Sequence, residues 1–185
     1  MELDKAIQSR HSVRKFKDKK PDWRTIIECI DSMRHAPMAG NNYTLKFILV
    51  DDEEKIKEIA EAASQQFISG AKFVLVVCSN PLRANNAYGD SGKVFARQQA
   101  GAAIQNFLLN IEESGLATCW VGYFNEERIK RELRIPENVD IEGIFPIGYE
   151  QEKPRTRKLK IDLDKIIYFN RFGNVHMRKE EKRVY

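Results

Sequence analysis

Apolar residues recur every three or four positions in several stretches of the chain, which is the spacing that one buried face of an α-helix requires. The clearest series follows Pro21-Asp22 and ends before Pro37; it consists of Trp23, Ile26, Ile27, Ile30 and Met33. The same spacing predicts helices over residues 2–9, 53–66, 93–114 and 126–133. The helix over 93–114 carries four small residues in a row, Ala100 to Ala103, which would let another backbone approach closely.

Continuous apolar runs predict buried strands over residues 47–50, 73–78, 117–124 and 141–149. The run at 73–78 is rich in β-branched residues, which favours a strand. Pro146 and Gly148 weaken a central strand, so they indicate an edge, a bulge or the close approach of a ligand within 141–149. Residues 79–92 contain three asparagines, two glycines and a proline, and we predict a mobile loop there, of the length of a lid.

The rest of the chain is predicted to be irregular. A basic loop over residues 153–158 leads to a short element at 162–168, and the charged tail 173–185 is expected to be extended or frayed. There is no internal repeat, linker or low-complexity tract. With 185 residues, the chain has the length of one domain, so we predict a single domain over residues 1–185.

Composition narrows the class of protein without identifying it. Hydrophobic residues make up 42% and charged residues 31% of the chain, which is typical of a folded domain. The net charge of +4 is too small to call for nucleic acid by itself. Cys29, Cys78 and Cys119 form no CxxC pair, so neither a zinc site nor a disulfide framework is indicated, and free thiols suit a reducing cytoplasm. There is no signal-peptide pattern and no apolar run long enough to span a bilayer, so we expect an intracellular protein.

The strongest candidate chemistry near the N-terminus is a basic cluster in which Arg10 and Arg14 bracket Ser12. Arginine offers a rigid fork of donors to phosphate and serine adds a hydroxyl, so the cluster could bind an anion. Taken alone, a solvated basic turn is the more common explanation of such a cluster. The second cluster, Arg155 to Lys158, has the same two explanations, and the two clusters could converge on one phosphate.

Other candidate sites are weaker. The glycine and asparagines of the loop Ala39-Gly40-Asn41-Asn42 favour a turn with positive φ. The loop offers amides and backbone groups that could read a planar ring, although it could equally be an ordinary helix-to-strand turn. The three histidines are isolated and no metal-ligand spacing is present, so we expect no metal site. No GxGxxG, GxSxG or Walker pattern occurs. Trp120 and Phe124 are interpreted as core residues.

Taken together, the motifs resemble the nitroreductase family. The segment 10–16, RHSVRKF, is similar to the family's N-terminal signature, and 36–41, APMAGN, to its A-P-S-x-x-N loop. Residues 105–109 and 115–120, QNFLL and GLATCW, resemble its central helix and strand. Further matches are IPE at 135–137, PIGY at 146–149 and the basic run 155–159. Each motif is weak alone, but their order and spacing over residues 3–172 make the resemblance specific.

The resemblance implies an α+β fold, with a mostly antiparallel central sheet flanked by helices, in an intertwined homodimer that binds FMN at the subunit interface. Arg10 and Ser12, together with Arg155 and Arg157, would bind the phosphate or its neighbourhood, and His11 belongs to the same segment. Arg14 would lie near the pyrimidine edge of the flavin. Met38, Ala39, Gly40 and Asn41 would come from the other subunit. Pro146, Ile147 and Gly148 would also belong to the cofactor site, where the backbone at Ile147 and Gly148 would approach flavin N5.

The implied activity is the NADH- or NADPH-driven, two-electron reduction of a small planar acceptor such as a nitroaromatic or a quinone. The flavin would carry the chemistry, and no protein residue is assigned as catalytic. Two alternatives stay open. The same FMN site could serve reductive dehalogenation or flavin fragmentation, which lid residues such as Tyr88 would decide. Alternatively, the basic clusters could belong to a non-enzymatic module that binds a nucleotide or RNA.

Overall fold

The computed structural model describes residues 2–152 and 161–177. The chain forms two compact units, residues 1–154 and 155–185. The first unit holds a four-stranded sheet and six α-helices, and the second holds a short 3-10 turn over Leu163–Lys165 among its described residues.

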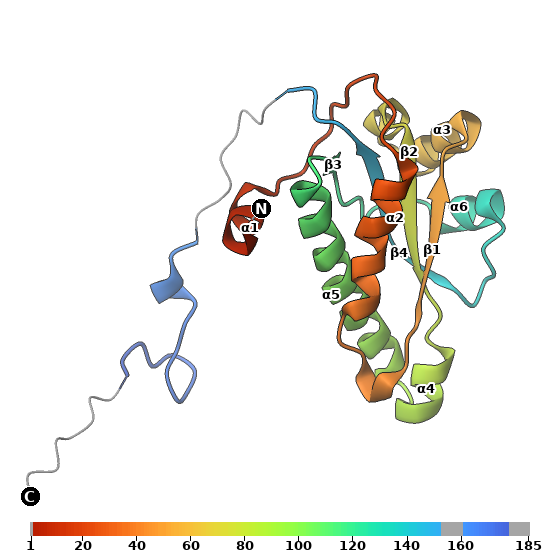
Figure 1. Ribbon diagram of the computed structural model, residues 1–185. Helices are drawn as coiled ribbons and strands as arrows, with labels where there is room; N and C mark the ends of the chain where they lie inside the picture. The colour runs from red at the N-terminus through yellow and green to blue at the C-terminus, as the bar shows by residue number, and fades with distance from the viewer. Residues whose placement is uncertain (1, 153–160, 178–185) are drawn as a thin grey trace, which may run out of the picture. The chain divides into compact units, whose positions relative to one another are not determined.

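The sheet is antiparallel throughout, with the strand order β1-β2-β4-β3 (Figure 1). Its strands are β1 (Leu45–Val50), β2 (Phe73–Ser79), β3 (Ala117–Thr118) and β4 (Asp140–Gly148). Every residue of β2 is buried, because this strand lies inside the sheet and helices cover both of its faces. The predicted α+β fold with an antiparallel sheet is therefore confirmed.

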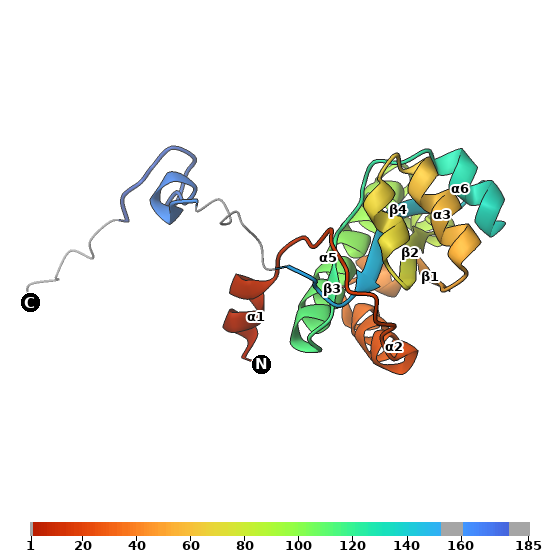
Figure 2. The ribbon, with the colours of Figure 1, turned by 90° about the horizontal axis from the view of Figure 1, so that it is seen from above.

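Helices cover the two faces of the sheet in separate layers (Figure 2). On one face, α2 (Trp23–Asp31) and α5 (Ser91–Glu113) pack against Phe73, Leu75 and Val77. On the other face, α3 (Glu53–Ala62) and α6 (Glu126–Leu133) pack against the alternate residues of the same strand, Val74, Val76 and Cys78. The α1 helix (Leu3–Ser9) contacts α5. The two cores follow from the period-2 alternation of a strand.

Local capping explains where several helices begin. The Asp22 carboxylate accepts a hydrogen bond from the backbone N–H of Arg24, and Asp52 caps α3 in the same way. The predicted helices at 2–9, 93–114 and 126–133 are confirmed to within two residues. The helix predicted over 53–66 ends earlier, at Ala62, and is followed by a 3-10 turn over Gln66–Gly70.

The loop predicted over residues 79–92 is wrong: Leu82–Tyr88 forms α4, and α5 begins at Ser91. The Asn80 side chain accepts a hydrogen bond from the backbone N–H of Leu82, and Pro81 occupies the N-cap of α4. Gly92 allows the close packing, because a Cβ there would meet the backbone of Ala84 and Asn85. The proline and glycines that suggested a loop therefore begin and pack a helix.

The strand predicted over 117–124 is shorter than expected, since β3 ends at Thr118 and pairing with β4 resumes only at Val121. Val121 and Ile144 exchange both backbone hydrogen bonds, at 2.9 and 3.0 Å. Alternation places the nitrogen of Pro146 on the same edge as that of Ile144, and proline has no N–H to donate. Pro146 therefore interrupts the ladder, whereas the register irregularity of the β2–β4 pair falls elsewhere, between Val77 and Cys78.

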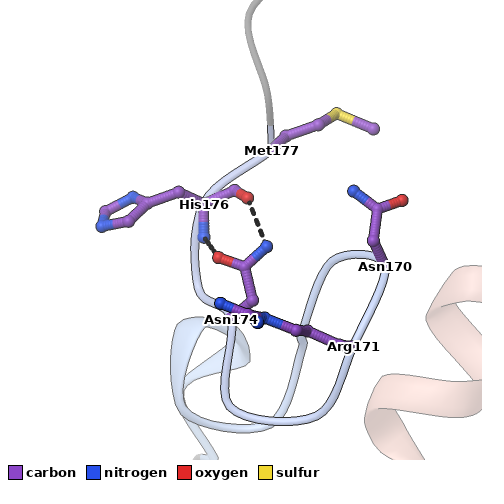
Figure 3. A pocket seen from close by; sticks show the side chains of 5 residues that line it. All are labelled: Asn170, Arg171, Asn174, His176 and Met177. Carbon is purple, nitrogen blue, oxygen red and sulfur yellow. Dashed lines mark hydrogen bonds between the residues drawn. The ribbon is translucent and has the colours of Figure 1, made fainter.

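The second unit contains an asparagine-centred turn. Asn174 Nδ2 donates to the carbonyl oxygen of His176 at 3.0 Å, and its Oδ1 accepts from the backbone N–H of the same residue at 3.3 Å (Figure 3). A pocket at this turn is lined by Asn170, Arg171, Asn174, His176 and Met177, none of which belongs to the predicted site. No helix among the described residues is both long enough and apolar enough to cross a membrane.

Candidate functional site

Residues 10–17, here called the arm, connect α1 to the sheet. The backbone N–H of Val13 donates to the carbonyl oxygen of Thr118 at 3.0 Å, and that of Lys17 donates to Tyr149 at 2.8 Å. Phe16 pairs with Glu150 and is buried. The arm therefore lies along the end of β4, so two of the predicted site segments, 10–14 and 146–148, are neighbours in space.

Two arginines of the arm, Arg10 and Arg14, have no carboxylate partner in the described part of the chain. Arg10 is partly buried, and Ser12 and Arg14 are exposed. Within residues 2–152 and 161–177, none of the three side chains forms an ion pair; Arg14 lies over the Phe67 ring, with Cζ 5.9 Å from the centroid. In contrast, Lys15 forms an ion pair with Glu152 at 3.0 Å. This end of the arm can therefore attract an anion.

His11 is bound by the protein on both sides of its ring. Nδ1 lies 2.9 Å from the carbonyl oxygen of Ser9, and Nε2 lies 2.7 Å from Oε1 of Glu150. Burial alone would lower the pKa of His11, but the hydrogen bonds to Glu150 and Ser9 and the negative charge of Glu150 raise it above the ordinary value of 6.5. The ring nitrogens are thus occupied within the chain.

The end of β4 is closely packed. Pro146, Ile147 and Gly148 are buried, and Ile147 is paired with Phe73 on one side and Thr118 on the other. A Cβ on Gly148 would overlap the Phe16 side chain, at 2.9 Å from Cδ1. The arm itself therefore explains why residue 148 is glycine.

The turn Met38–Asn41 has the positive backbone angles that its sequence predicted, with φ of 55° at Gly40 and 57° at Asn41. Gly40 lies directly beneath the hydroxyl of Tyr88, the last residue of α4, so a side chain at position 40 would overlap that hydroxyl. The Tyr88 ring packs edge-on against Phe95, with centroids 5.2 Å apart. The turn and α4 thus form one packed surface.

Within one chain, this turn is far from the arm (Figure 1). The turn packs against α4 and α5, whereas β3, which the arm contacts, directly follows the C-terminal end of α5. A helix of 23 residues spans about 34 Å. The structure therefore divides the predicted site residues into two groups at opposite ends of the first unit. Arg155 and Arg157 lie outside the described residues.

Some features of these two ends were not evident from the sequence. Glu150, the partner of His11, lies 139 residues away from it in the chain, and no motif connects the two. Trp120, interpreted as a core residue, is 43% exposed and packs against Gly143 and Phe145. Phe124 is partly buried against the second core, as predicted.

Comparisons with known proteins agree with this architecture. The model of the nitroreductase family matches residues 7–72 and 63–149. A protein of Archaeoglobus fulgidus whose name places it among NADH dehydrogenases and NAD(P)H nitroreductases is 32% identical over 154 residues, which cover 80% of this chain and 86% of that protein. The FMN reductase [NAD(P)H] of Bacillus subtilis is 25% identical, over 83% of this chain and 70% of its own.

A solved structure extends the similarity to three dimensions. The crystal structure of a nitroreductase family protein from Clostridium novyi NT superimposes with a TM-score of 0.75 at 28% identity, covering 94% of this chain and 96% of the other. The family match and the shared fold include the arm, the Met38–Asn41 turn and the end of β4. The chain therefore belongs to the nitroreductase family and is an oxidoreductase.

Proposed function

We propose that this protein is an FMN-dependent oxidoreductase that uses NADH or NADPH to reduce small planar acceptors, such as nitroaromatics or quinones, in two-electron steps. The observation that carries the proposal is the arm. It holds two arginines that have no carboxylate partner among the described residues, on either side of an exposed serine and next to the end of the sheet. Such a donor set suits a phosphate monoester.

The residues of the arm fit the phosphate of FMN. Arg10 and Ser12 would bind the phosphate group, with Arg155 and Arg157 as further candidates, and Arg14 would place a positive charge near the pyrimidine edge of the flavin. When bound, FMN would carry electrons from the nicotinamide to the acceptor. The role of the protein is then to bind, orient and exclude water, and no side chain is assigned as an acid or base.

We infer a homodimer, because the second group of site residues, Met38 to Asn41, lies too far from the arm to reach the same flavin within one chain. Several large apolar side chains of the first unit are exposed, among them Leu3, Trp23 and Val94. The described part of the second unit exposes eight others: Ile161, Leu163, Ile166, Ile167, Tyr168, Phe172, Val175 and Met177. A second copy of the chain would cover such surfaces and complete the site.

The choice of a planar acceptor rests on the Met38–Asn41 turn. Two successive residues with positive φ expose backbone groups, and Asn41 adds an amide, so the surface suits a flat guest with donors and acceptors. The name of the Bacillus subtilis relative supports both the flavin and the nicotinamide. Three buried free cysteines suit a reducing compartment, which supports a cytoplasmic location.

The proposal is tested in two stages on the purified full-length protein. Heat release and chromatography should yield FMN in preference to FAD. Anaerobic stopped-flow should then show bleaching of flavin absorbance by NADH or NADPH, and its recovery on addition of a nitroaromatic or a quinone. FAD as the dominant species, or no flavin after reconstitution, contradicts the cofactor assignment.

The second stage also separates the reductase from its alternative. If FMN binds but neither nicotinamide bleaches it at a useful rate, the assignment of a reductase activity is wrong. The same FMN site would then serve other chemistry, namely reductive dehalogenation or flavin fragmentation. A protein that binds RNA and no flavin would indicate the non-enzymatic module.

A further inference from the structure

His11 and Glu150 form a contact that the proposed activity does not use directly. The two residues are in contact but lie near opposite ends of the first unit's sequence, since His11 is in the arm and Glu150 directly follows β4. The side chains are 22% and 28% exposed, so water screens the contact only in part. This contact joins the segment between Arg10 and Ser12 to the sheet.

The neighbours of the imidazole determine its charge. A backbone carbonyl can only accept a hydrogen bond, so Nδ1 must donate to Ser9. A glutamate at neutral pH is a carboxylate and also only accepts, so Nε2 must donate to Glu150. A histidine that donates from both nitrogens is an imidazolium, and the arm therefore carries a positive charge between Arg10 and Ser12 as well.

The other attachments of the arm show why this contact matters at one end of it. Residues 13–17 are held by backbone hydrogen bonds to Thr118 and Tyr149 and by the buried side chains of Val13 and Phe16. Residues 10–12 have no backbone hydrogen bond to the sheet in the described part of the chain. His11 is thus the side chain that attaches this part of the arm to the end of β4.

We propose that Glu150, acting through protonated His11, is a positioning residue that holds Arg10 and Ser12 in place for the cofactor phosphate, so that FMN affinity falls as His11 loses its proton. The inference rests on the proposed function, because it takes FMN as the ligand of the arm. Neutral imidazole can donate from only one nitrogen, so one of the two attachments is lost on deprotonation.

The charges around His11 give the direction of the pH dependence. Burial is the largest single influence on the pKa of His11 and lowers it. The hydrogen bonds to Glu150 and Ser9 and the negative charges of Glu150, after β4, and Glu112, on α5, together outweigh burial, so the folded-state pKa lies above 6.5. The attachment is therefore fully present below pH 6.5 and is lost as the pH rises through the folded-state pKa. The FMN phosphate also titrates near neutrality, but its contribution is common to all variants.

The first measurement needs no cofactor. The chain has three histidines, so their ring protons can be resolved by NMR in the apoprotein and assigned with His35→Gln and His176→Gln. We expect the His11 pKa to lie above 6.5 and to fall in Glu150→Gln. The matched control is Glu152→Gln, which removes a negative charge two residues after Glu150. Glu152 pairs with Lys15 at the surface, so its replacement should leave the His11 pKa almost unchanged.

The second measurement is the FMN dissociation constant, from quenching of flavin fluorescence between about pH 5.5 and about pH 8.5, the range in which histidine titrates. We expect FMN binding by the wild type and Glu152→Gln to weaken about 3- to 10-fold across this range, the scale of one ordinary hydrogen bond. Glu150→Gln should bind FMN without this step, because the glutamine amide can donate to neutral Nε2 while Nδ1 donates to Ser9 at every pH. His11→Arg, which keeps the positive charge and the hydrogen-bond donors at every pH, should bind FMN more tightly than the wild type at high pH.

The outcomes separate this proposal from the proposed function. If FMN binds but Glu150→Gln follows the wild-type pH profile, the positioning role is wrong and the cofactor assignment stands. If the His11 pKa does not respond to Glu150→Gln, the contact does not exist in solution and the proposal is likewise overturned. If no variant binds FMN at any pH, the proposed function fails, and the positioning role fails with it.

Discussion

Arg10 and Lys15 lie five positions apart on one arm, but their surroundings differ. Lys15 is paired with Glu152, whereas Arg10 is partly buried and has no carboxylate partner among the described residues. A half-buried cation without a counter-ion is a cost to the free protein, which a bound phosphate would remove. At the scale of the residue, the absence of a partner for Arg10 therefore carries more information than its charge.

Replacement of Arg10 by alanine should weaken FMN binding by about 1.5–3 kcal/mol, the scale of a lost charge-assisted hydrogen bond. Titration of the apoprotein with FMN measures this change, and denaturant unfolding measures the accompanying change in stability, which should be smaller. Arg131→Ala, at an exposed position of α6, is the control and should bind FMN like the wild type. Equal affinities for Arg10→Ala and the wild type would show that Arg10 is only a surface charge.

At the scale of the element, α4 owes its position to the first turn of α5. Gly92 is buried, and the atoms that surround its missing side chain belong to the backbone of α4. Backbone atoms cannot move aside as the end of a flexible side chain can. The packing of α4 on α5 in turn places Tyr88 over Gly40, so the Met38–Asn41 turn depends on the same contact.

Gly92→Ala should therefore destabilise the protein, although alanine is the better helix former by about 1 kcal/mol. Overpacking of this kind costs about 1–3 kcal/mol, and we expect the net change in the free energy of unfolding to be unfavourable. Urea denaturation measures it, with Ser91→Ala, at an exposed neighbouring position, as the control. A Gly92→Ala variant as stable as the wild type would mean that the two helices are packed less closely than described.

At the scale of the whole molecule, the four consecutive small residues of α5, Ala100 to Ala103, divide into two pairs. Ala100 and Ala103 are 1% and 0% exposed and pack in the core of their own chain. Gly101 and Ala102 are only partly buried, and a Cβ on Gly101 would meet no atom within 4 Å. Only the second pair can contact another subunit, so the predicted close approach narrows to these two residues.

Light scattering should give a dimer for the wild type, and Gly101→Arg should shift it towards the monomer and reduce the FMN retained, because the proposed site needs both chains. Gly70→Arg is the matched control, since Gly70 also has open space around it but lies in the turn that packs against α3 on the other face of the sheet. A wild-type monomer saturated with FMN, or a Gly101→Arg variant that stays dimeric, contradicts the prediction.

Short-range patterns determined much of this protein. The amphipathic spacing located five of the six α-helices, the apolar run at 73–78 identified the buried central strand, and the Gly40-Asn41 pair predicted a turn with positive φ. These features depend on backbone preferences and on burial of one face, which neighbouring residues encode. The arm, the turn and the end of β4 were named as site segments because their motifs resemble those of a family.

Only the tertiary structure decided the rest, because each remaining feature depends on residues far apart in the chain. Residues 82–88 can form a helix because Gly92 of the next helix has no side chain to overlap its backbone. The strand β3 ends where Pro146 of β4 has no N–H to donate. The pairing of His11 with Glu150, and the separation of the arm from the Met38–Asn41 turn, arise from the order of strands in the sheet and the length of α5. Sequence spacing encodes which face of an element is buried, but the fold determines which faces meet.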